Sequence, residues 1–325
     1  MLQAFAEVEM NVADAASLRL SAGRKLVSLG AGRLVDTRYG PGIPQAFDGF
    51  EATLTGGSRQ VTGLYVRPVD IGLDSFDDRT SGQKALWGVY ATQWLSENRA
   101  TGFDLYYLGL RDRNAVYDQG VGREVVHTFG TRMFGDIGFS YWNLEGGVQG
   151  GTFGDRRRVG WGMGAEFGRR PLEVPLQPDV RLSADVISGD DDPDDSKLGT
   201  FNPYFPRGKY FTSQSPIGPR NLIHVRPSIT LHPYKNVQVA LSASAYWRQS
   251  KGDGVYAISG NLVRSGADSD ARFIGTQVEL AVAWQATPEL NLSASVGAFD
   301  PGTFVRQTGP AEVMKLIGVT ANYRF

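Results

Sequence analysis

The feature that most constrains this chain is the alternation of apolar and polar residues along its last segment. The apolar set is Phe325, Tyr323, Ala321, Val319 and Ile317, and the residues between them are Arg324, Asn322, Thr320 and Gly318. A period of two predicts a strand with one apolar face. Taken alone, this segment suits the edge strand of a soluble sandwich as well as the terminal strand of an outer-membrane barrel.

Other segments repeat the pattern over greater lengths than soluble strands need. In 237–248 the valines, leucine, alanines and Trp247 share one face, and in 272–285 the apolar face ends near Trp284. Such runs span about 9–13 residues, enough for a tilted strand to cross a bilayer, whereas ordinary strands average about 5–6. About fifteen strands are predicted: 2–10, 15–26, 47–54, 59–69, 84–95, 102–111, 123–134, 137–149, 158–168, 179–188, 222–231, 237–248, 272–285, 290–299 and 312–325.

The connections between these strands differ in length on the two sides of the predicted sheet. With the C-terminus on the periplasmic side, the connections on that side are 11–14, 55–58, 96–101, 135–136, 169–178, 232–236 and 286–289. Those on the other side are mostly longer: 27–46, 70–83, 112–122, 150–157, 189–221, 249–271 and 300–311. Short turns on one side and long loops on the other are typical of outer-membrane barrels. We therefore predict an all-β, antiparallel transmembrane β-barrel spanning 1–325 as one domain, located in a bacterial outer membrane among lipid and lipopolysaccharide.

Charge and strand parity add two expectations. Lys and Arg (33) nearly balance Asp and Glu (34), which gives no support for nucleic-acid binding. The odd strand count places Met1 on the external side, whereas bacterial barrels have an even number of strands. Because the first residues also lack the pattern of a signal peptide, we expect an N-terminal truncation; a miscounted strand in the first 55 residues is the alternative.

A set of short motifs runs in order along nearly the whole chain. They are 22–26 with Gly30, 32–35 and Arg38; 47–49; 127–132; Glu145 and Gln149; 188–190; 200–206; 221–222; and 299–302. Their order and spacing resemble the alginate export family of outer-membrane channels for an anionic exopolysaccharide. The resemblance implies a barrel of roughly 18 strands in the intact protein, and so about three strands before Met1. It also implies an arginine-lined lumen with a few carboxylates, and periplasmic export partners.

Inward-facing charged residues are the candidate substrate pathway. Alternation and motif matches select Arg24, Arg33, Arg38, Arg132, Arg181, Arg226, Glu145 and Asp185. Further inward candidates are Arg19, Lys25, Arg158, His224, Arg248, Glu166 and Glu279, and only one of Arg24 and Lys25 is expected to point inward. A guanidinium pairs bidentately with a carboxylate at any relevant pH, and a ring of arginines selects anions. For any single arginine, a structural ion pair is the alternative.

The remaining motifs offer no clear second chemistry. The connection 27–46 either folds inward as a constriction or stays exposed, and the acidic run 189–195 is better explained as solvated than as a Ca²⁺ site. His127 falls on the apolar phase, His232 lies in a turn, and His224 has no evident orienting carboxylate. We therefore expect no enzyme activity, cofactor or metal. The competing function is an anion-selective or substrate-specific porin for small-solute uptake.

Overall fold

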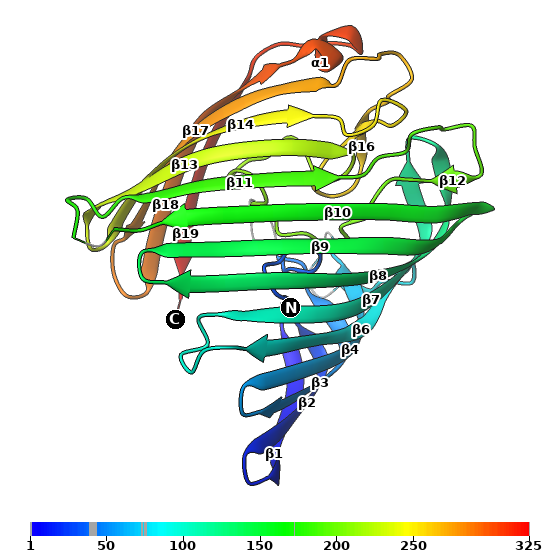
Figure 1. Ribbon diagram of the computed structural model, residues 1–325. Coiled ribbons are helices and arrows are strands. Elements are labelled where there is room, and N and C mark those ends of the chain that lie inside the picture. Colours follow the sequence, from blue (N-terminus) through cyan, green and yellow to red (C-terminus); the bar gives the residue numbers. More distant parts are fainter. Residues whose placement is uncertain (1, 39–43, 73, 75–76, 172, 325) are drawn as a thin grey trace.

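A single curved antiparallel sheet forms the body of the molecule in the computed structural model (Figure 1). The structure describes residues 2–38, 44–72, 74, 77–171 and 173–324. The long strands are β1 (Ala4–Ala13), β2 (Ala16–Lys25), β3 (Phe47–Gly56), β4 (Arg59–Asp70), β6 (Lys84–Trp94), β7 (Gly102–Tyr117), β8 (Gly120–Ile137), β9 (Ser140–Phe153), β10 (Arg156–Arg169), β11 (Asp179–Ile187), β13 (Leu222–Tyr234), β14 (Val237–Trp247), β17 (Phe273–Gln285), β18 (Leu290–Pro301) and β19 (Met314–Tyr323). Each corresponds to one predicted strand.

The minor elements lie in the long connections. They are β5 (Arg79–Thr80), β12 (Lys197–Leu198), β15 (Val255–Tyr256), β16 (Leu262–Arg264) and the single-turn helix α1 (Thr303–Gln307). β5 pairs with β4, β12 lies parallel to β10, and β15 and β16 form a separate hairpin. Among the described residues, no helix has the length and apolar composition needed to cross a membrane.

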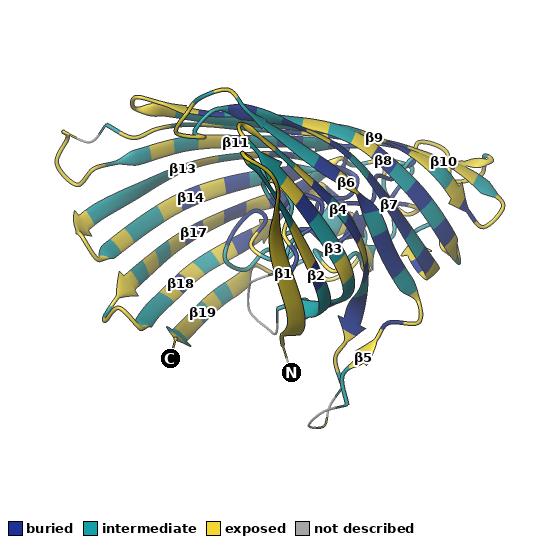
Figure 2. Cartoon of the chain, turned by 90° about the horizontal axis from the view of Figure 1, so that it is seen from below, coloured by how far each residue is buried: buried dark blue, intermediate teal, exposed yellow. Residues whose placement is uncertain are grey.

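Each long strand pairs with the next long strand along the chain. The antiparallel ladders run without interruption from β1 through β4, then β6 to β11, β13, β14 and β17 to β19. The sheet curves round so that β1 and β19 lie toward the same side (Figure 2). This up-and-down order needs only local hairpins, which is the arrangement of transmembrane barrels.

The two faces of the sheet differ as the alternation predicts. On β10, Met163 and Phe167 are 63% and 53% exposed. Arg158, which belongs to the alternate set of residues on this strand and faces inward, is fully buried. On β19, Ile317 and Val319 are 74% and 81% exposed. Bands of exposed residues alternate with less exposed ones along the strands (Figure 2). The apolar side chains therefore face outward, where lipid would contact them, and polar side chains face the interior.

Two hairpins are tighter than the sequence suggested. β7 and β8 extend to a two-residue turn at 118–119, and β9 and β10 meet at 154–155, so the predicted connections 112–122 and 150–157 are largely strand. The turn after β8 lies at 138–139 rather than at 135–136. Polar and glycine-rich residues at these strand ends interrupt the apolar alternation, but the backbone ladder continues past them.

Two connections fold into the interior of the barrel: the described part of the first (residues 26–38 and 44–46) and residues 188–221, here called the inward segments. Leu34 and Val35 of the first pack with Phe201 and Phe205 of the second, against inner-face residues such as Leu108. Val35 and Phe205 also form an isolated parallel bridge. The expectation left open for 27–46 is thus resolved for its described part, which folds inward.

Candidate functional site: a charged lumen with two inward segments

Arg33 carries the first inward segment into a cluster of acidic groups on the barrel wall. Its guanidinium pairs with Asp185 of β11, lies 3.7 Å from a carboxylate oxygen of Glu145 on β9, and donates to the Tyr210 hydroxyl at 3.1 Å. The Arg33 side chain is 8% exposed, that of Glu145 is 7% exposed and that of Asp185 is 4% exposed. A charge buried this deeply persists only when it is paired, so Arg33 fixes the segment in place.

A second ion pair lies on β7 and β8. The Nε of Arg132 donates to Asp104 at 2.5 Å, and the Tyr90 hydroxyl donates to the same carboxylate oxygen at 2.5 Å. Asp104 is fully buried, whereas Arg132 keeps 14% of its side chain exposed and stacks over Phe134. Most of the Arg132 charge is therefore compensated within the wall.

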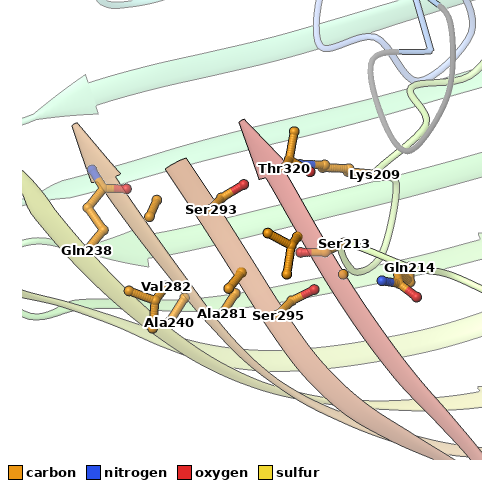
Figure 3. A pocket seen from close by; sticks show the side chains of 14 residues that line it. Lys209, Ser213, Gln214, Gln238, Ala240, Ala281, Val282, Ser293, Ser295 and Thr320 are labelled. Atoms are coloured by element: carbon orange, nitrogen blue, oxygen red, sulfur yellow. The ribbon is translucent and has the colours of Figure 1, made fainter. Parts of the chain in front are cut away.

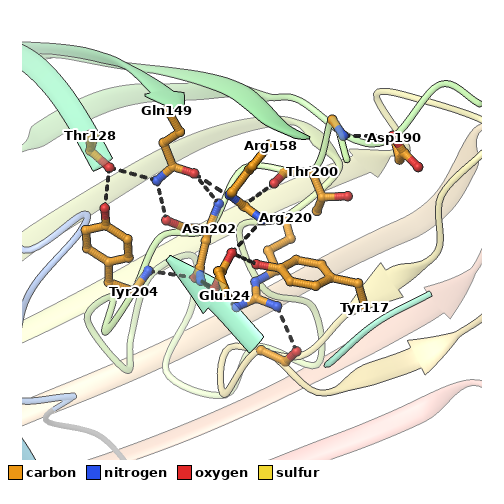
Figure 4. A network of polar contacts seen from close by, with 12 residues as sticks. Tyr117, Glu124, Thr128, Gln149, Arg158, Asp190, Thr200, Asn202, Tyr204 and Arg220 are labelled. Carbon is orange, nitrogen blue, oxygen red and sulfur yellow. Dashed lines mark hydrogen bonds and ion pairs between the residues drawn. The ribbon is translucent and has the colours of Figure 1, made fainter. Parts of the chain in front are cut away.

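The second inward segment is held by a larger polar network (Figure 4). Glu124 of β8 lies 2.6 Å from Nη1 of Arg158 on β10, with both side chains fully buried, and accepts hydrogen bonds from Tyr117 and from the Asn202 amide. Arg158 also donates to the Thr200 carbonyl. The motif 200–206 therefore attaches to the wall through side chains of β8 and β10.

Further contacts of the same network extend along the segment. Gln149 donates from Nε2 to the Asn202 carbonyl at 2.7 Å and accepts from the Asn202 N–H at 2.8 Å. The Tyr204 and Thr128 hydroxyls share a hydrogen bond. At the end of the segment, the Asn221 amide donates to three carbonyls of the 250–254 connection. The motifs that run in order along the sequence thus include residues that anchor this segment.

The structure resolves the ambiguity between Arg24 and Lys25. The register places Arg24 beside Ala4 and Asp48, on the face that also carries Phe50, and Arg24 pairs bidentately with Asp48. Lys25 lies on the inner face, where its Nζ contacts Ser21 and Glu51. Placing Arg24 in the lumen was therefore wrong, because its motif match overrode the strand phase.

Three further predicted arginines lie in the interior and differ in how far nearby carboxylates neutralise their charge. Arg181 lies 3.7 Å from Glu166 and 3.4 Å from Asp179. Arg226 has no salt bridge to a described residue, and its Nε is buried without a hydrogen-bond partner. Arg38 stacks over Phe205 and donates to the Tyr204 carbonyl. Burial, with Arg220 nearby, lowers the Arg38 pKa to about 10, so this residue stays charged at neutral pH.

Sequence reasoning missed several residues that complete these clusters. Asp104 and Glu124 lie on inner strand faces and pair with predicted arginines, so the alternation alone could have identified them. Asn202 and Tyr210 lie in irregular segments, where no periodicity reports their orientation. Their partners are 78 and 177 positions away in the chain, at Glu124 and Arg33.

His224 differs from the sequence-based expectation. Its Nδ1 lies 3.1 Å from Asp185, so the statement that it lacks an orienting carboxylate was wrong. Its ring packs between Phe211 and Tyr246, and its Nε2 has no hydrogen-bond partner. A catalytic histidine must reach a nucleophile or substrate proton. No serine, threonine or lysine side chain of the described residues bonds to this ring.

The described part of the chain holds no group of three or more His, Cys, Asp or Glu residues arranged to bind a metal ion. In the acidic run, Asp190 is buried and bonds to the neighbouring backbone, while Asp191, Asp192 and Asp194 are exposed. The described contacts of this run are those of a partly solvated loop.

Comparison with known proteins identifies the architecture. The model of the family described as alginate export matches residues 1–319. No curated protein matches the chain. Among solved structures, it is similar to Pseudomonas aeruginosa OccK2 (OpdF) in complex with glucuronate, with 11% identity, 98% of this chain and 80% of that chain covered, and a TM-score of 0.58.

Two further solved structures give the same result. A BenF-like porin from Pseudomonas fluorescens Pf-5 matches with 10% identity over 95% of this chain and 77% of the other, at a TM-score of 0.59. Pseudomonas aeruginosa OccK3 (OpdO) matches with 13% identity over the same shares, at a TM-score of 0.56. At these identities the likeness establishes the fold, that of outer-membrane β-barrel porins.

Proposed function

Since the chain belongs to the alginate export family and folds as an outer-membrane channel, we propose that it conducts an anionic exopolysaccharide whose sugars carry carboxylates. The observation that carries this proposal is the set of lumen cations without a paired carboxylate. Arg226 and Arg38 form no salt bridge with a described residue, and neither does Lys209 or Arg207 of the second inward segment.

The compensated and uncompensated cations have separate roles in this proposal. Arg33, Arg132 and Arg158 pair with buried carboxylates and hold the inward segments and the wall. A cation that lacks a carboxylate partner attracts mobile anions, and a planar guanidinium suits a uronate carboxylate. Weak contacts at several such cations let a polymer advance without being trapped.

Conductance through planar lipid bilayers tests the proposal. We expect an anion-selective current that a polyuronate blocks and that a neutral polysaccharide of the same length leaves unchanged. The matched neutral polymer controls for simple occlusion of the opening. A cation-selective current, or equal block by both polymers, would overturn the proposal.

A porin for small anionic solutes is the second candidate, favoured by the fold neighbours, one of which was solved with glucuronate. The two functions differ in whether a polymer can pass. Proteoliposomes loaded with fluorescent oligouronates of increasing length separate them. Release of long oligomers supports export of a polymer, whereas release restricted to one or two sugars supports uptake of small solutes.

A further inference from the structure

A cavity of about 260 Å³ lies where the second inward segment crosses the last strands of the barrel (Figure 3). Lys209, Ser213 and Gln214 border it from the segment, and β14, β17, β18 and β19 form the wall. A neighbouring cavity of about 720 Å³ shares Ser213, Gln214 and Gly318 with the first and extends to Arg38. The two adjoining cavities are here called the β19 groove.

The groove contains cations and no carboxylate. Lys209 and Arg38 are the charged residues that line the two cavities, and no Asp or Glu is among the described lining residues. Lys209 makes no ion pair or hydrogen bond with the described residues, and the Arg38 Nε is buried without a partner. The space around Arg33 and Glu145 differs, because it amounts to about 30 Å³ and its charges are paired.

The wall of the first cavity is lined mostly with small and hydroxyl-bearing side chains, whereas the second cavity is also bordered by the larger apolar residues Met314, Leu316 and Ile317 of β19. The hydroxyls come from Ser293, Ser295 and Thr320, and the short side chains of the β17 alanines do not narrow the cavity. At Gly318 an added Cβ would lie 2.2 Å from the Gln214 amide nitrogen, so the Gln214 side chain packs directly over this glycine and would have to move to admit a larger residue. Hydroxyls and amides can exchange hydrogen bonds with sugar hydroxyls, while short side chains do not obstruct a moving chain.

We propose that the anionic saccharide travels along the β19 groove, with its carboxylates passing between Arg38 and Lys209, rather than past the arginines that pair with carboxylates of β7 to β11. This inference rests on the proposed function and specifies its route. The paired cluster at Arg33, Arg132 and Arg158 then acts as the fixed side of the lumen.

Cysteine accessibility tests the route, because the natural chain has no cysteine. Ser295→Cys places a thiol in the groove, and Ser183→Cys places one on the inner face of β11. In proteoliposomes, the thiol at position 295 is modified with a negatively charged methanethiosulfonate. We expect a soluble polyuronate to slow this reaction several-fold. Modification at position 183 should not change. Protection at position 183 alone would overturn the route.

The charge at Lys209 is tested in the same background. At position 295, the rate of modification by the anionic reagent is divided by the rate of modification by a neutral one. Lys209→Gln should lower this ratio several-fold. Lys235→Gln, which removes an exposed lysine from the β13–β14 turn, is the matched control and should leave the ratio unchanged. An unchanged ratio in Lys209→Gln would contradict the role of this residue.

The two proposals fail in different ways. If the unmodified channel shows no anion selectivity and no polyuronate block, the proposed function is wrong and the route falls with it. If selectivity and block are present but position 295 is neither protected nor sensitive to Lys209, the function stands and only the β19 groove is rejected.

Discussion

The Nη1 atom of Arg158 lies 2.6 Å from a carboxylate oxygen of Glu124, and neither side chain is exposed to solvent. The two residues come from β10 and β8, on either side of β9, and the Asn202 amide of the second inward segment completes the cluster. An ion pair in this position links the barrel wall to the segment. These buried charges therefore support the structure, and the proposed function assigns contact with solutes to the less compensated ones.

Replacing one member of this pair should destabilise the protein strongly. Glu124→Gln leaves the Arg158 charge buried without its partner, and such losses cost about 3–5 kcal/mol. Arg158→Gln likewise leaves the Glu124 carboxylate buried without its partner. The double variant should cost clearly less than the sum of the two, because it removes both charges. Urea unfolding in lipid vesicles measures each free energy, and additive costs would show that the pair is not coupled.

Anion selectivity should depend more on Arg226 than on Arg132. Arg226→Ala removes a lumen cation that has no salt bridge to a described residue, whereas Arg132→Ala removes one that Asp104 already neutralises. The ratio of chloride to potassium permeability, taken from reversal potentials across a salt gradient, should fall several-fold in Arg226→Ala. In Arg132→Ala it should fall less. The reverse order would mean that Asp104 does not screen Arg132.

The strands could be predicted from the sequence because lipid imposes a rule on every second residue. Outward positions such as Val319 and Met163 must be apolar, so the period of two persists wherever a strand crosses the bilayer. The rule stops at the rims. β7 and β8 therefore continue beyond the predicted boundaries, where solvent replaces lipid and Asn114 or Gly122 is tolerated.

The site was less predictable, because strand phase gives the direction of a side chain but not its partner. Phase placed Arg132, Arg181, Arg226, Glu145 and Asp185 correctly on the inner face. Whether each is neutralised depends on register across strands and on the path of irregular segments. Lys209 lies in such a segment, with no flanking alternation, and only the three-dimensional arrangement brings it to the wall of β17 to β19.

Asp190 should make the second inward segment less stable as pH rises. Burial, with Asp253 and Asp195 nearby, raises its pKa to about 6, against the opposing effect of the Gly199 N–H and Arg156. The folded state therefore holds a proton that the unfolded chain, with a normal pKa near 4, has released. Stability associated with this group is greatest below pH 4 and is lost as pH rises through 6.

The variant Asp190→Asn isolates this effect. The amide oxygen still accepts from the Gly199 N–H and no charge develops, so the variant should be more stable than the natural chain above pH 6, by about 1 kcal/mol. Below pH 4 the two should be nearly equal. Thermal unfolding followed at several pH values measures the difference. A difference that is the same at pH 4 and pH 8 would assign it to packing instead of ionisation.

Gly164 is the residue on β10 over which the Arg33 guanidinium lies. A Cβ added there would be 2.2 Å from the Arg33 Nη1 and 2.7 Å from a carboxylate oxygen of Asp185, so Gly164→Val must displace the ion pair that docks the first inward segment. Released from the wall, the segment exposes Arg33 and Arg38 to protease. Trypsin should then cleave after one of these residues several-fold faster than in the natural protein.

A matched glycine on the neighbouring strand tests whether this effect is local. Gly146 on β9 faces outward, and a Cβ there would meet only ordinary contacts, at 3.7 Å from the Gly162 carbonyl and from Met163. Gly146→Val adds the same bulk and the same β-branched side chain without approaching Arg33. Its cleavage rate should equal that of the natural protein. Equal acceleration in both variants would indicate a general loosening of the barrel, and no acceleration in Gly164→Val would show that Arg33 does not hold the segment.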